Sequence, residues 1–180
     1  PKVMAVRRNG KIKYVGRGFE MRTMDFGRGP KLSSVIPWGD LYTAYWQTGI
    51  PNITVYMPFR GSKLEILLFP LIKLMMSVPY FRKRAMAKAG RAIGPSEEAR
   101  ASNRIHVWGE VGNAAGKVVT AKIEVPDGYT VTMDGINITA DFLLSYQGEG
   151  GCYTPSQLMG HDLVERLPGA GTLTVLNRSE

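Results

Sequence analysis

The sequence predicts an α+β fold, with a mixed and largely antiparallel sheet and helices packed mainly on one of its faces. Two stretches of alternating apolar and polar residues, in residues 4–36 and 105–125, are typical of antiparallel strands. Within the first of these stretches, Asn9-Gly10 separates two alternating runs, and this pair favours a type I′ hairpin turn. The helical patterns come mostly later in the chain, and strands followed by helices indicate α+β.

The N-terminal elements follow from these patterns. Phe19, Met21 and Thr23 alternate with charged residues, and residues 31–36 resume the alternation after a glycine-rich turn. Asp40 is expected to cap a short helix over 41–47, because its carboxylate accepts unpaired N–H groups. Residues 49–52 close that helix, and residues 53–57 form a short strand.

Residues 59–104 are expected to form a helical insertion within one domain that spans 1–180. Five apolar residues fall at helical spacing on one face, and Pro70 is expected to kink the helix or begin a second one. A basic helical stretch, 82–91, follows. The five apolar residues at helical spacing are Leu64, Leu67, Leu68, Leu71 and Met75. Ser96 caps one more short helix.

The C-terminal third begins with a long hairpin over 105–125. A helix over 130–146 and a glycine-rich linker follow. Thr154 is then expected to cap a second helix, with Pro155 at its first position and apolar residues continuing to Leu167. A strand over 172–176 ends the pattern.

Composition narrows the classes of function. The net charge of +8 suits an anionic partner, but no nucleic-acid-binding motif occurs, so we expect no nucleic acid partner. Cys152 is the single cysteine, and no Cys/His set has the spacing of a metal site. A reducing cytoplasm is the expected compartment.

Two groups of residues are candidates for a ligand site. Trp38, Gly39 and Asp40 precede three aromatic residues, Tyr42, Tyr45 and Trp46, and this group forms either an aromatic packing cluster or a pocket wall. Tyr153-Thr154-Pro155 is either a helix cap alone or an anion-binding helix start. His106 and His161 have no nucleophile at motif spacing, and His106 is interpreted as a sheet-face residue.

No dinucleotide fingerprint follows a strand, and the glycines of residues 148–151 come after a helix instead. Nothing in this chain is therefore expected to bind NAD or NADP by itself.

Several long motifs nevertheless resemble one family. The segment TMDFGRGPKLSSVIPWGDLYTAYWQTGIPNITVY (23–56), with VWGEV (107–111), DGYTVT (127–132) and GCYTPSQLMGHDLVERLPG (151–169), is similar to the saccharopine dehydrogenase-like oxidoreductases, which include trans-acting enoyl reductases. Members carry an N-terminal Rossmann domain that binds NAD or NADP. The resemblance implies that this chain is the substrate-binding and dimerisation domain that follows the Rossmann domain, and that it is inactive alone.

The resemblance also implies a set of cleft residues. Tyr45 or Tyr153 would donate a proton to a carbonyl, imine or enoyl substrate. The substrate-binding positions would be Trp38, Gly39, Asp40, Thr48, Asn52, Thr154 and Pro155. The expected partners are the Rossmann domain of the same gene product, a second copy of the chain and a small-molecule substrate.

A second hypothesis is not enzymatic. The apolar helix over 64–81 and the basic stretch 82–91 would bind a lipid or membrane surface. The competing interpretations are a buried helix followed by a solvated basic one, or a wall for an acyl chain.

Overall fold

A computed structural model describes residues 4–59, 68, 71–72, 74–90 and 94–178 of the 180-residue chain. It confirms the α+β class, since helices accompany three antiparallel sheets. The chain divides into two compact units, Pro1–Pro58 with Glu97–Glu180 (unit 1), and Phe59–Ser96 (unit 2).

The N-terminal hairpin forms where the Asn-Gly pair predicts it. Strand β1 (Met4–Arg8) pairs antiparallel with β2 (Lys11–Val15). Asn9 and Gly10 connect them with φ angles of 51° and 74°. Positive φ at both central residues is the requirement of a type I′ turn, so the sequence interpretation is confirmed.

The second sheet encloses the small N-terminal core. Its strands run antiparallel in the order β3 (Met21–Asp25), β4 (Pro30–Val35) and β5 (Tyr56–Pro58). Ile53, in the predicted strand 53–57, bridges to Arg7 of β1 instead of joining β5. Val6, Val15 and Val35 form the buried apolar cluster that joins these two sheets.

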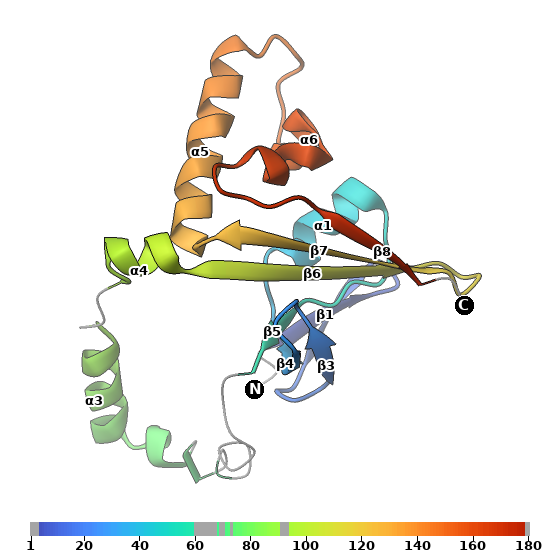
Figure 1. The fold of residues 1–180 in the computed structure, drawn as a ribbon. Helices are drawn as coiled ribbons and strands as arrows, with labels where there is room; N and C mark the ends of the chain where they lie inside the picture. The colour runs from blue at the N-terminus through green and yellow to red at the C-terminus, as the bar shows by residue number, and fades with distance from the viewer. Residues whose placement is uncertain (1–3, 60–67, 69–70, 73, 91–93, 179–180) are drawn as a thin grey trace. The chain divides into compact units, whose positions relative to one another are not determined.

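The third sheet consists of a long hairpin and an edge strand (Figure 1). Its two faces carry different side chains. Cross-strand pairs such as Val107 with Ile123 and Ile105 with Val125 make one face apolar. The opposite face is polar, and there Glu110 contacts Arg22 of β3 at 2.8 Å. The strands are β6 (Arg104–Gly112), β7 (Val118–Pro126) and β8 (Thr174–Arg178).

The helices of unit 1 follow the predicted order with two changes of extent. Asp127 caps α5 (Gly128–Ser145) by accepting a hydrogen bond from the backbone N–H of Tyr129. A hydrogen bond from Asn103 and this cap lower the pKa of Asp127. The predicted single helix after Thr154 is wrong in extent. Gly160, at φ 94°, separates α6 (Pro155–Met159) from a 3₁₀ helix (His161–Arg166).

Unit 2 contains helix α3 (Pro79–Gly90), preceded by helical residues at 71–72 and 74–77. Of the predicted apolar face, Leu64 and Leu67 lie outside the described residues, as does Pro70, whereas Leu68, Leu71 and Met75 are described and exposed. Helix α4 (Glu97–Ser102) then begins the return to unit 1, directly after the predicted cap Ser96.

Tyr56 carries a pH-dependent part of the stability of unit 1. Burial and its hydrogen bond to Glu20, whose carboxylate also pairs with Arg8 at 3.3 Å, raise the pKa of Tyr56 from 10 to about 12. Because the raised pKa belongs to the folded state, this contribution is complete below pH 10 and is lost as the pH rises to 12. Two pKa units correspond to about 2.7 kcal/mol, and solvent screening of this half-buried group reduces the expected loss to about 1 kcal/mol.

We expect Tyr56→Phe to remove this alkaline step while leaving the rest of the pH profile in place. Urea unfolding of both proteins between pH 9 and pH 12 measures the step directly. Parallel profiles for the two proteins across that range would contradict the assignment.

Candidate functional site

Helix α1 (Asp40–Thr48) presents a stripe of aromatic side chains to solvent. Tyr42 and Trp46 are four residues apart in the helix and share one side of it, Trp38 precedes the N-cap, and all three are exposed, Trp46 by 79%. A hydrogen bond with Tyr14 of β2 raises the pKa of Tyr42 and brings a further exposed ring to this side. The stripe is a wide apolar surface with hydroxyl groups at its edge.

The predicted cap of this helix is wrong. Gly39 is the N-cap residue and has no side-chain bond, and Asp40 is the first helical residue. Gly39 already has helical angles, φ −56° and ψ −32°, so its carbonyl accepts from the backbone N–H groups of Tyr42 and Thr43. The carboxylate of Asp40 therefore lies in the first turn, where the helix dipole favours a negative charge.

Tyr45 lies between two elements of unit 1. Its ring is 4.4 Å from the guanidinium carbon of Arg7 and packs edge-on against Trp46. Its hydroxyl borders Gly10, where an added Cβ would lie 3.2 Å away. Tyr45 therefore anchors α1 on the β1–β2 hairpin and is only half-buried.

Thr48, the last residue of α1, and Asn52, in the loop after it, both bond to the backbone. Thr48 Oγ1 donates to the carbonyl of Ala44 at 2.6 Å and accepts from the N–H of Ile50. Asn52 Oδ1 accepts from the backbone N–H of Asn9 at 3.0 Å. Both side chains fix the loop that closes α1.

The second predicted group forms the start of α6. Thr154 and Gln157 make a reciprocal capping box, with Pro155 in the first turn, which confirms the predicted cap. Tyr153 is 41% exposed, and its hydroxyl donates to the carbonyl of Glu149 at 3.3 Å.

Gln47 joins the two groups. Its Oε1 accepts hydrogen bonds from Ser156 Oγ at 3.1 Å and from Thr154 Oγ1 at 3.4 Å. The end of α1 therefore adjoins the start of α6, although the residues are more than 100 positions apart. Gly39 and Asp40 lie at the other end of α1, eight and seven residues from Gln47 or about 10–12 Å along the helix axis, and Trp38 precedes them.

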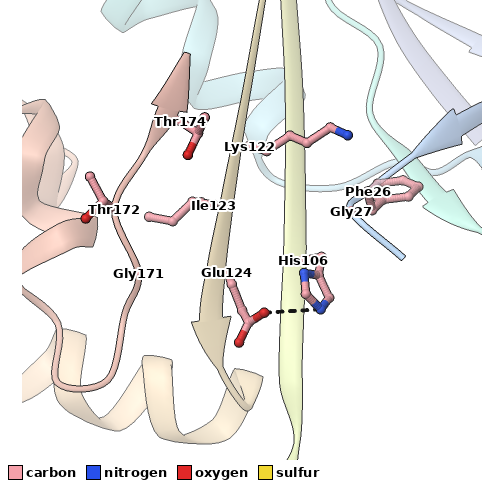
Figure 2. Close-up of a pocket in the computed structure, with 9 residues that line it drawn as sticks. All are labelled: Phe26, Gly27, His106, Lys122, Ile123, Glu124, Gly171, Thr172 and Thr174. Atoms are coloured by element: carbon pink, nitrogen blue, oxygen red, sulfur yellow. Dashed lines mark ion pairs between the residues drawn. The ribbon is translucent and has the colours of Figure 1, made fainter. Parts of the chain in front are cut away.

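A separate pocket of about 220 Å³ opens beside the polar face of the third sheet (Figure 2). His106 Nε2 lies 3.5 Å from Glu124 Oε2 across the β6–β7 pair. This nitrogen is buried without a hydrogen bond to any described residue. The lining residues are Phe26, Gly27, His106, Lys122, Ile123, Glu124, Gly171, Thr172 and Thr174.

The turn that covers this pocket is held in place by Asp25. Its Oδ1 accepts from the backbone N–H groups of Gly27 and Gly29, at 2.7 and 3.0 Å. The bond from Gly27, with the charge of Lys122 at 3.8 Å, lowers the pKa of Asp25. Gly27 has a φ of 111°, and a Cβ there would lie 3.6 Å from His106 Nδ1. The turn is therefore rigid and fits closely over the imidazole.

Sequence reasoning placed His106 on a sheet face and did not predict this pocket. The hairpin turn at residues 113–116 was a usable signal, because counting back from it places position 106 opposite position 123 or 124. The approach of the Asp25–Gly27 turn, 80 residues earlier in the chain, has no such local signal.

Within the described ranges, no group of three or more His, Cys, Asp or Glu side chains is arranged to hold a metal ion. None of the helices described here is long and apolar enough to cross a membrane.

Comparison of the chain with family models, with curated proteins and with solved structures found no match.

Proposed function

We propose that this chain is the substrate-binding and assembly domain of an NAD(P)-dependent oxidoreductase of the saccharopine dehydrogenase-like kind. The observation that carries the proposal is the junction of α1 with α6 through Gln47. The motifs that resemble the family lie in two distant stretches, 38–52 and 151–169, and this junction brings the two together. Such convergence is expected of one substrate site built from separate segments.

The side chains at this junction suit an unsaturated substrate. Trp46, next to Gln47, offers an exposed ring, and Tyr42, one turn earlier on the same side of α1, extends this surface for the body of the substrate, whereas Trp38 lies at the other end of α1. NADH or NADPH, bound by a Rossmann domain of the same gene product, supplies the hydride. The chain then has to orient the carbonyl, imine or enoyl group and deliver one proton to the atom that becomes negative.

Tyr153 is the better placed of the two tyrosines for this proton transfer. Its hydroxyl is bound only to the carbonyl of Glu149 among the described contacts, and its ring is exposed beside the α6 start. The ring of Tyr45 is instead committed to Arg7 and Trp46, and its hydroxyl borders Gly10. We therefore assign Tyr153 the donor role and Tyr45 a positioning role.

The assembly part of the proposal is supported by the apolar face of the third sheet. Val107, Val111 and Val175 lie on that face and are between 47% and 54% exposed. Contiguous exposed apolar residues typically mark a surface that another protein covers. A second copy of the chain and the Rossmann domain are the two expected partners.

The experiment compares two proteins: the 180-residue chain, and the same chain joined to the Rossmann domain of its gene product. A panel of enoyl thioesters, imines and ketones is offered with NADH and with NADPH, and nucleotide oxidation is followed at 340 nm as substrate is reduced. We expect turnover only with the joined protein. Absence of turnover with every substrate class in the joined protein would contradict the proposal.

A further inference from the structure

The positive charge of the chain is concentrated in one segment. Residues 66–96 contain six basic residues and no aspartate or glutamate, whereas the whole chain has a net charge of +8. The basic residues are Lys73, Arg82, Lys83, Arg84, Lys88 and Arg91. Most of the charge excess therefore lies in unit 2, and the rest of the chain is close to neutral.

The described part of this segment exposes its apolar side chains. No side chain in the described part of unit 2 is buried. Leu74 is 67% exposed and Tyr80 is 63% exposed, and several neighbours are also exposed. These neighbours are Leu68, Leu71, Ile72, Met75, Val78, Phe81 and Met86. So many exposed apolar side chains, followed along the chain by cations, mark a surface that a membrane or another molecule covers.

The apolar and basic residues are separated along the chain rather than around one helix. Six of the eight residues 71–78 are apolar, Tyr80 and Phe81 lie in the first turn of α3, and Arg82, Lys83 and Arg84 follow directly. Helix α3 has 12 residues and is thus about 18 Å long, shorter than the 30 Å hydrocarbon layer of a bilayer. Long basic side chains can keep their charge at the phosphate level while their stems cover apolar surface.

We propose that unit 2 docks on the surface of a bilayer that contains anionic phospholipid. Leu71, Leu74 and Tyr80 enter the boundary between headgroups and acyl chains, and the adjoining arginines and lysine bind the lipid phosphates. Charge decides between the candidate occupants. A second copy of unit 2 would bring the same positive charge into contact, and a nucleic acid would leave the leucines in water. This inference goes beyond the oxidoreductase proposal and does not depend on it.

The test is co-sedimentation of the full 180-residue chain with vesicles of phosphatidylcholine alone, or with 30% phosphatidylserine added. We expect binding only to the anionic vesicles. We also expect release at 0.5 M NaCl, because salt at this concentration shortens the Debye length and screens the attraction between the basic side chains and the anionic lipids. Each basic side chain near such a surface strengthens binding about fivefold. The charge-reversal variant R82E/K83E/R84E should therefore lower the partition coefficient by at least about 100-fold.

Two further variants separate the contributions. The variant L71S/L74S keeps every charge and should weaken binding by at least about tenfold, because its apolar contact with the acyl region is lost. The matched control K11E/K13E/K117E changes the net charge by the same amount at exposed lysines of unit 1, and should weaken binding by less than about fivefold. Circular dichroism confirms that each variant is folded.

The proposal fails on any of three results. The first is that wild-type protein remains in the supernatant with anionic vesicles, and the second is that the control loses as much binding as R82E/K83E/R84E. The third is that L71S/L74S binds as wild type does, which would indicate charge attraction without insertion. Because no nucleotide or substrate is present in these experiments, none of these results bears on the oxidoreductase proposal.

Discussion

Replacing Arg7 with methionine is expected to lower the free energy of unfolding by about 3 kcal/mol. Arg7 is 5% exposed, and its guanidinium lies inside unit 1. Nε donates to the carbonyl of Leu41 at 2.8 Å, and a terminal nitrogen donates to the carbonyl of Gly10 at 2.6 Å. Methionine preserves the apolar stem but removes both of these donors, at about 1–3 kcal/mol each.

The substitution Arg7→Met is also expected to loosen the attachment of α1. The guanidinium contacts the start of α1 through Leu41 and the ring of Tyr45 at 4.4 Å, so it joins the helix to the β1–β2 hairpin. The melting temperature should fall by about 6–12 °C for a chain of this length. Lys13→Met, on the exposed side of the neighbouring strand, is the matched control and should change stability by less than about 0.5 kcal/mol. Equal melting temperatures for the two variants would show that Arg7 does not hold α1.

The second large effect concerns turnover rather than stability. In the protein that includes the Rossmann domain, Tyr153→Phe should lower kcat by about 10²–10⁴-fold, the usual contribution of a positioned proton donor. Nucleotide affinity should stay within about twofold, because our proposal assigns the cofactor to the Rossmann domain. The side chain is 41% exposed and its loss should leave the fold intact.

Tyr129→Phe provides the control for Tyr153→Phe. Tyr129 is an exposed tyrosine in the first turn of α5 and is outside the α1–α6 junction. A similar fall in kcat for both variants would assign the effect to general disturbance. Unchanged kcat in Tyr153→Phe would remove this tyrosine from the mechanism and leave Tyr45 as the candidate to examine.

Local chemistry decided which elements could be predicted from the sequence. The Asn9-Gly10 turn and the Thr154-Pro155 helix start are determined by residues next to each other, and both are present. The Asp40 cap failed because Gly39 already adopts helical angles. The helix predicted after Thr154 is too long, because the apolar spacing continues past Gly160 whereas the α-helical backbone ends before this glycine.

The site depended on contacts that no local pattern contains. Gln47 did not stand out in the sequence, yet it joins two helices whose contact residues are 107 and 109 positions away. The pocket beside His106 likewise needs the register of β6 with β7 and the approach of the Asp25 turn. Sequence motifs could therefore indicate which segments matter, but not which side chains connect them.

Nucleotide binding tests the central claim most directly. Isothermal calorimetry would measure the affinity of NADH and NADPH for the 180-residue chain and for the protein that includes its Rossmann domain. Our account predicts micromolar binding to the longer protein and no heat of binding with the 180-residue chain. Micromolar binding of either nucleotide by the 180-residue chain alone would contradict the account, because the cofactor site would then lie within this domain.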